Sequence, residues 1–364
     1  MFTRLYCITV LFLILPLTYQ KRNTTYVVDI KDENHKVTKY TAVLLFVIFL
    51  LYGIVSNILL AIVFCRRRDN HYSREFIVIG SQLIISSFMA FIPQMVVVLP
   101  EILRTKNSSF ADQMIWINRI FATFATIPFF AILYFSFLLT LNRFVALILP
   151  KCYIVFEAAR LYFLIAFVWL SVLANTAVDI YYCTRRFNVL KVSWEADCTK
   201  SGAAGDIWWR MRYFLAILIP NVKFVIYIMI FYSIRHKRLF ATDNNQRKTN
   251  ICAGNEMNEM KIHHYEWLML IQAAWECAIM EIGIIAFNFL PKCLSRIFDE
   301  RAIIPSKIFI NCYFIFICAS LPTVHFIYNK RAREIIKHYL YRWLNLKIGQ
   351  LKNKVGVRKH STLW

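Results

Sequence analysis

The sequence predicts an all-α membrane protein in which seven transmembrane helices form a bundle and an eighth helix lies on the membrane surface. Hydrophobic residues make up 59% of the 364 residues, whereas soluble domains are about 45–50% apolar. These residues gather in seven continuous blocks, each long enough to cross about 30 Å of hydrocarbon as a helix. Continuous blocks favour helices over barrel strands, which are about 10 residues long and alternate strictly.

The first 20 residues are predicted to be a signal peptide. Arg4 provides a positive n-region, and the apolar run Leu5–Leu17 has the length of an h-region rather than of a membrane span. Because Tyr19-Gln20 is not a small-residue cleavage site, an uncleaved anchor is the alternative. Residues 21–39 are expected to form an extracellular N-terminal segment.

The seven predicted spans fill most of residues 40–328, with polar connections between them. In chain order they are Tyr40–Cys65, Phe76–Pro100, Met114–Leu141, Leu161–Tyr182, Tyr213–Ile234, Trp267–Leu290 and Ile303–Tyr328. The longest polar connection is Arg235–His264. The sequence has no evident internal repeat and no soluble domain.

Two features predict an outer N-terminus and a cytoplasmic C-terminus. The sequons at Asn23 and Asn107 fall on the same side of a seven-span chain, and N-glycosylation occurs on the lumenal side. Lys and Arg are enriched in the opposite segments, above all in "CRRRDNHYSR" and in the tail, where Glu334 is the only acid. The net charge of +22 is therefore attributed to cytoplasmic basic residues and not to nucleic-acid binding.

The fifth and sixth predicted spans contain three charged residues. Lys223 is in the fifth span, roughly 15 Å below its outer end, and Glu281 and Glu276 in the sixth are roughly 14 and 21 Å deep. Because charges at such depth face the bundle interior and pair, we expect a Lys223–Glu281 ion pair, with Glu276 as the other candidate. The two glutamates are about 140° apart on the helix and are not expected to share a partner. The alternative is that each carboxyl is protonated and bonded to a local carbonyl.

Three of the ten cysteines, Cys183, Cys198 and Cys293, are expected on the oxidising side of the membrane. Cys183 and Cys198 can close one outer loop on itself. Cys198–Cys293 is the rival pairing, and an odd count leaves one thiol free. The sequence contains no CxxC or HExxH metal motif, no Gly-rich phosphate loop and no catalytic grouping, so neither a cofactor nor an enzyme activity is predicted.

An amphipathic helix is predicted at the start of the C-terminal segment, residues 329–364. Apolar pairs recur every four residues, at Ile335-Ile336, Tyr339-Leu340 and Trp343-Leu344, with basic residues beside them. Such a helix lies on the inner leaflet, and the alternative is a packing helix of the soluble kind. The basic residues of Lys347–Lys359 are expected to hold the tail near anionic lipid.

Three motifs carry a resemblance to a known family. "GIVSN" contains Gly53 and Asn57, "LTLNRFVALILP" contains Asn142-Arg143, and "LPTVHFIYNKRAREI" contains Pro322 at the end of the seventh span. With this topology, the chain resembles the rhodopsin-like G-protein-coupled receptors. More narrowly, it is similar to the nematode serpentine chemoreceptors, in the group that contains classes g, v and x, from about Tyr40 to Trp343.

The resemblance implies a small-molecule ligand between the outer halves of the helices, a heterotrimeric G-protein partner at the inner face, and a sensory cilium as the location. It implies that Asn142 and Arg143 serve G-protein coupling. From their depth in the bundle, Lys223, Glu276 and Glu281 are expected to line the ligand cavity.

The sequence also departs from the pattern of this family. Asn142 stands where most receptors have Asp, so the usual acid beside Arg143 is missing, and Glu266 is a candidate substitute. The second span has no Asp and the sixth has no Pro inside it. The alternative role for Arg143 is an anchor whose side chain reaches the lipid headgroups.

Two other classes of membrane protein also fit several spans. An insect-type ligand-gated chemoreceptor channel has seven spans with its N-terminus inside, so the glycosylation of Asn23 and Asn107 discriminates. A small-molecule transporter usually has inverted repeats and helices broken by Gly or Pro, whereas this chain has only 8 Gly.

Both Asn23 and Asn107 are expected to carry N-linked glycans, because both sequons are predicted to lie outside. Treatment of the expressed protein with an N-glycosidase should raise its electrophoretic mobility. Asn23→Gln and Asn107→Gln should each remove part of that shift. If neither substitution changes the mobility, the orientation is inverted and the receptor interpretation loses its topology.

Overall fold

The computed structural model describes residues 36–66, 73–103, 118, 120–122, 124–189, 192–198, 202–246, 253–298, 303–339, 341, 342 and 345. The predicted signal peptide, Asn23, Asn107 and the basic stretch Lys347–Lys359 lie outside these residues. The side chains of 237–246 and 253–270 are also outside the description, so the predicted partner Glu266 is placed only as part of a helix.

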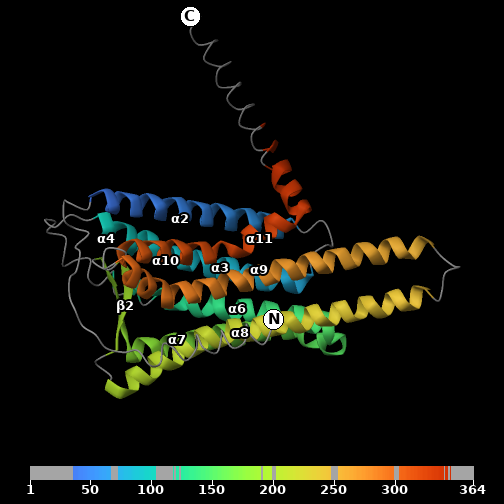
Figure 1. The fold of residues 1–364 in the computed structure, drawn as a ribbon, viewed down its shortest axis with the longest axis horizontal. Coiled ribbons are helices and arrows are strands. Elements are labelled where there is room, and N and C mark those ends of the chain that lie inside the picture. The colour runs from blue at the N-terminus through green and yellow to red at the C-terminus, as the bar shows by residue number, and fades with distance from the viewer. Residues whose placement is uncertain are drawn as a thin grey trace, which may run out of the picture.

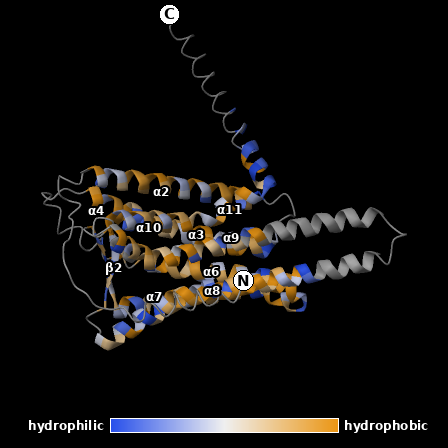
Figure 2. Cartoon of the chain, viewed as in Figure 1, coloured by the Kyte–Doolittle hydropathy of each residue, from blue (hydrophilic) through white to orange (hydrophobic). Residues whose placement is uncertain are grey.

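The chain folds as a bundle of seven antiparallel spans (Figure 1), which confirms the predicted all-α fold class. Among the described residues, six helices are long and apolar enough to cross a membrane, and a bent pair of helices supplies the seventh span. Hydrophobic residues predominate along the helices of the bundle, as the colouring by hydropathy in Figure 2 shows. The spans are α2 (Lys36–Cys65); α3 (Arg74–Pro93) continued by η3 (Gln94–Val98) and α4 (Leu99–Leu103); α6 (Thr126–Ile148); α7 (Ala158–Tyr182); α8 (Gly202–Gln246); α9 (Ala253–Phe298); and α10 (Ile303–Cys318) with α11 (Ser320–Tyr328).

The two ends of the bundle differ in the elements attached to them. One end carries a two-stranded hairpin, β1 (Thr184–Asn188) paired with β2 (Ser193–Asp197), and is called the hairpin end. At the other, here the tail end, residues 330–339 form a further helix that leaves the bundle at a steep angle (Figure 1). Asn329 starts this helix because its Oδ1 accepts a hydrogen bond from the backbone N–H of Ala332 at 3.0 Å. The helix predicted after the seventh span is therefore present.

The fifth and sixth spans extend much further than their apolar blocks. The predicted polar connection Arg235–His264 is mostly helical, because α8 runs to Gln246 and α9 begins at Ala253. Arg235–Gln246 contains neither Gly nor Pro, so nothing in it interrupts the backbone hydrogen bonds of a helix that has already formed. The bounds of the apolar blocks marked the membrane-crossing part of each helix and not the whole helix.

The seventh span is bent by 60° between α10 and α11, and one buried side chain compensates for the bend. Pro322 has no N–H to donate to the carbonyl of Cys318, four residues earlier. Asn57 Nδ2 donates to that carbonyl at 3.1 Å and to the carbonyl of Gly53 at 2.8 Å. Gly53 lets α3 approach, because a Cβ there would lie 2.7 Å from Phe91 Cζ. The Gly53…Asn57 pair and Pro322 are thus parts of one contact between α2 and the seventh span.

The hairpin lies over its end of the bundle and is attached at several points. A disulfide joins Cys183 to Cys198, the first of the two predicted pairings, and Cys293 is a free thiol. At the turn, Val192 adopts a positive φ of 46°, and its carbonyl accepts a hydrogen bond from Asn311 Nδ2 of α10 at 2.7 Å.

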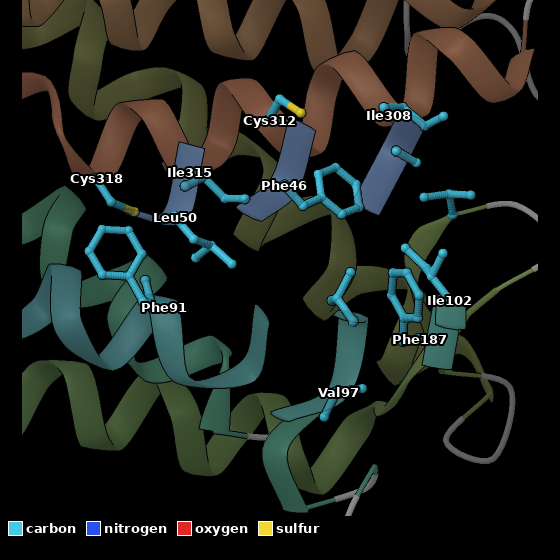
Figure 3. Close-up of a cluster of buried hydrophobic side chains, with 14 of the residues drawn as sticks. Phe46, Leu50, Phe91, Val97, Ile102, Phe187, Ile308, Cys312, Ile315 and Cys318 are labelled. Carbon is cyan, nitrogen blue, oxygen red and sulfur yellow. The ribbon is translucent and has the colours of Figure 1, made fainter. Parts of the chain in front are cut away.

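Buried side chains beneath the hairpin form a core that unites the first, second and seventh spans (Figure 3). The side chain of Phe187, from β1, belongs to this cluster. The other labelled members are Phe46, Leu50, Phe91, Val97, Ile102, Ile308, Cys312, Ile315 and Cys318. The hairpin is therefore a packed cap and not a free loop.

Asn57→Ala should lower the free energy of unfolding by about 1–3 kcal/mol, because it leaves the buried Cys318 carbonyl without a donor. Thermal unfolding of the purified protein in detergent micelles measures the effect. Asn221→Ala is the matched control, since the Asn221 amide donates only to the Ile217 carbonyl of its own helix. Equal losses in the two variants would mean that the contact between α2 and the bend is not important for stability.

Candidate ligand and coupling site

A column of polar side chains runs through the interior of the bundle. On α6, Ser136, Thr140 and Arg143 are four and three residues apart, so they share one face of the helix. All three are buried, and that face is turned toward α8 and α9.

Lys223 of α8 lies at the centre of this column and is only 2% exposed. Its Nζ donates to Ser136 Oγ at 3.1 Å and lies 3.3 Å from Met280 Sδ of α9. One turn further along α8, the Tyr227 hydroxyl is 3.0 Å from Thr140 Oγ1. The α6 and α8 faces are thus joined by two rungs of side-chain hydrogen bonds.

Glu276 and Glu281 of α9 lie near Lys223. Glu276 is 9% exposed, interacts electrostatically with Arg143 and Lys223, and is hydrogen-bonded by Gln272. Glu281 also interacts electrostatically with Lys223. In each glutamate, Oε1 is buried and has no hydrogen-bond partner.

The direct Lys223–Glu281 ion pair that the depths predicted is not formed, and Glu276 does not replace it. Within the described side chains, Lys223 Nζ has hydrogen-bond contacts with Ser136 and Met280. The physical reason is the rotation of α9 about its axis, which turns Met280 toward Lys223. Glu276 and Glu281 lie at other angles around the same helix and do not face Lys223 directly. The three charges are close enough to interact through a low-dielectric interior but are not in contact.

Arg143 is turned into the bundle at the tail end of α6 and is 8% exposed. Its Cζ lies 5.5 Å from the centroid of the Phe76 ring. That ring stacks on His325 of α11, whose Nδ1 is 3.2 Å from Gln272 Nε2. The adjacent Asn142 is also buried. This inward orientation differs from that of an arginine anchored in lipid headgroups.

The loop after α6 is attached to the second span beside Arg143. It forms the short helix η4 (Pro150–Phe156), in which the Tyr153 hydroxyl donates to Glu75 Oε2 at 2.8 Å. Burial, followed by this bond and the charge of Glu75, raises the pKa of Tyr153 to about 12. Tyr153 therefore keeps its proton, and with it the bond, across the physiological pH range.

A second charged cluster lies at the hairpin end and was not predicted. Asp179 of α7 is 1% exposed and receives donors from three directions. Arg185 Nε of β1 donates at 3.0 Å, Arg212 Nη1 of α8 at 3.2 and 3.3 Å, Trp208 Nε1 of α8 at 3.0 Å, and Thr126 Oγ1 of α6 at 3.2 Å. One carboxylate thus ties α6, α7, α8 and the hairpin together.

Simple signals in the sequence point to the residues that were missed. Asp179 is the only acid within α7, and an isolated acid in an apolar span indicates a buried partner. Gln272 and Glu276 are four residues apart, as are Lys223 and Tyr227. Polar pairs at this spacing mark the inward face of each helix. Among the described residues, no group of three His, Cys, Asp or Glu side chains is placed to hold a metal ion.

No protein-family model and no curated protein sequence matches this chain. The crystal structure of squid rhodopsin is similar, with a TM-score of 0.64 over 89% of this chain and 92% of the rhodopsin chain. The two sequences are 13% identical, so the likeness is one of fold. The chain therefore has the seven-helix fold of rhodopsin, as the motifs around Asn57, Arg143 and Pro322 led us to expect.

Lys223→Met should lower the free energy of unfolding by about 1–3 kcal/mol, because it removes a cation near two buried carboxyl groups. The double variant Lys223→Met/Glu276→Gln should lose less than the sum of the single variants, as expected for coupled sites. Thermal unfolding in detergent micelles checks the cycle. The control pairs Lys223→Met with Glu334→Gln, on the exposed helix 330–339, and should be additive. Additivity in both cycles would refute the coupling.

Proposed function

We propose that this chain is a G-protein-coupled chemosensory receptor of the nematode serpentine type. A small molecule binds in the interior of the bundle, and a heterotrimeric G protein binds at the tail end. The observation that carries the proposal is the position of Arg143, which is buried at the tail end of α6 and interacts electrostatically with Glu276 inside a rhodopsin-like fold.

Glu276 is proposed to replace the acid that is missing beside Arg143. Asn142 is neutral, so α6 itself provides no neighbouring carboxylate. Glu276 lies on α9, and its interaction with Arg143 therefore favours the arrangement in which α9 stays close to α6. A change that moves Glu276 releases this constraint at the tail end, where a G protein would then reach Arg143.

The ligand site is proposed to lie around Lys223, Glu276 and Glu281. These groups are not in direct contact with one another, and both carboxyl groups have a buried oxygen without a partner. A polar ligand that donates a hydrogen bond to Glu276 changes how strongly Glu276 interacts with Lys223 relative to Arg143. Since a ligand shifts a conformational equilibrium only through different affinities for the two states, this balance is the basis of activation.

The receptor proposal is favoured over the two alternatives. The match to squid rhodopsin extends over 89% of this chain and 92% of the other, which supports a receptor over an insect-type channel or a transporter with repeats. The resemblance of the motifs supports a location in the plasma membrane, and specifically in a sensory cilium. With the N-terminus outside, the helix 330–339 and the basic tail lie against the anionic inner leaflet.

Arg143→Ala should abolish signalling while it preserves surface expression, because it removes the charge proposed to contact the G protein. The test expresses the chain in cultured cells and images calcium or cAMP against a panel of volatiles and worm secretions. Surface level is measured in the same cells by labelling of an N-terminal epitope tag.

Arg160→Ala is the matched control, because Arg160 is an exposed arginine at the same end of the bundle. It should respond like the unmodified receptor. A normal response of Arg143→Ala at normal surface level would show that Arg143 is not needed for G-protein coupling.

A further inference from the structure

The charged cluster at the hairpin end contains more positive than negative charge. Two guanidinium groups, those of Arg185 and Arg212, share the single carboxylate of Asp179. That carboxylate already accepts from both arginines and from Trp208 and Thr126. Asp179 therefore neutralises one cation, and the buried cluster retains a net charge of about +1.

The two arginines are compensated to different degrees. The Arg212 guanidinium is surrounded by the rings of Phe129, Phe130 and Trp209, whose centroids lie 4.8, 5.4 and 5.6 Å from its Cζ. These ring faces stabilise a desolvated cation. Arg212 thus has both a carboxylate and an aromatic environment.

Arg185 has less. It meets Asp179 through Nε alone, and its Nη2 is buried without a hydrogen-bond partner. The residue opposite it on β2 is Ala196, so the strand pairing brings no acid directly across from it. Burial lowers the pKa of the Arg185 guanidinium, and Asp179 only partly offsets this effect. Among the described residues, a second anion is the group that this environment lacks.

The position of Arg185 suits a binding group. It follows the disulfide-bonded Cys183 by two residues, on a hairpin that is packed on the bundle. Its side chain is 13% exposed, so the residue lies at the margin of the buried cluster, while Nη2 itself is buried and unpartnered. The Nε–Asp179 bond fixes the plane of the guanidinium, which leaves its Nη groups in the forked geometry that matches an oxyanion.

We propose that Arg185, oriented by Asp179 and supported by Arg212, is a binding site for the oxyanion group of a small molecule, either a carboxylate or a phosphate. The same chemistry is presented by a free organic anion and by a lipid headgroup. As a ligand class for the receptor, this inference rests on the proposed function. Anion binding itself does not, because it concerns only the hairpin end of the folded chain.

The test uses the purified full-length protein in a nonionic detergent without added lipid. Its thermal unfolding is followed with increasing sodium succinate or inorganic phosphate, against sodium chloride at matched ionic strength. A parallel series adds dioctanoyl phosphatidylglycerol, against a neutral detergent of similar chain length. We expect a saturable rise in unfolding temperature with an oxyanion that chloride does not reproduce.

Arg185→Gln should weaken the apparent affinity for the anion by at least about tenfold, since it removes a charge-assisted hydrogen-bond donor. This variant should still fold, because Arg212 and Asp179 remain paired. Arg185→Lys keeps the charge but loses the fork and should bind with intermediate affinity. Arg186→Gln, the exposed neighbour on β1, is the matched control and should bind as the unmodified protein does.

Each outcome of the experiment is decisive. A response to succinate or phosphate identifies a soluble anion site, and a response to phosphatidylglycerol alone identifies a lipid headgroup site. The proposal is overturned if no oxyanion stabilises the protein beyond chloride, or if Arg186→Gln loses as much affinity as Arg185→Gln. The assay contains no G protein, so its failure leaves the Arg143 experiment intact, and a failure of that experiment leaves this one intact.

Discussion

The cost of burying charge between apolar helices is the constraint on which the rest of this structure depends. A charged group that leaves water must find compensation within the protein. Lys223, Arg143 and Glu276 lie inside the bundle and come from three different helices. The relative rotation of α6, α8 and α9 is therefore set by polar contacts as well as by apolar packing. Ser136 and Thr140 specify this rotation, because Ser136 hydrogen-bonds Lys223 of α8 and Thr140 hydrogen-bonds Tyr227 of α8.

The two buried charge clusters are organised in opposite ways. Asp179 is saturated by donors from α6, α8 and the hairpin, so the hairpin ends of these elements behave as one unit. Glu276 and Glu281 each keep an oxygen without a partner, and Lys223 contacts neither of them directly. The first arrangement favours a single geometry, whereas the second leaves several of similar energy. A ligand-responsive element requires the second kind.

The seventh span connects these regions mechanically. Asn311 of α10 binds the carbonyl of Val192 in the hairpin turn, and the Cys318 carbonyl at the end of the same helix is held by Asn57 of α2. Beyond the bend, His325 of α11 stacks on Phe76, the ring over which Arg143 lies. One span therefore contacts the hairpin, contains the bend and packs on Phe76, the ring over which the proposed coupling residue lies. A displacement of the hairpin has a continuous packed route to the tail end.

The sequence by itself determined the seven spans, the helix at 330–339 and the bend near Pro322, because hydropathy, helical periodicity and the missing proline N–H act locally. It also marked Lys223, Glu276 and Glu281 as buried groups that need explanation. Only the tertiary structure decided which groups the buried charges meet. Met280 and not Glu281 faces Lys223, and Asp179 accepts hydrogen bonds from residues up to 53 positions away in the sequence. Such pairings depend on how each helix is rotated about its axis. That rotation is fixed by the packing of the whole bundle and is not encoded in any single segment.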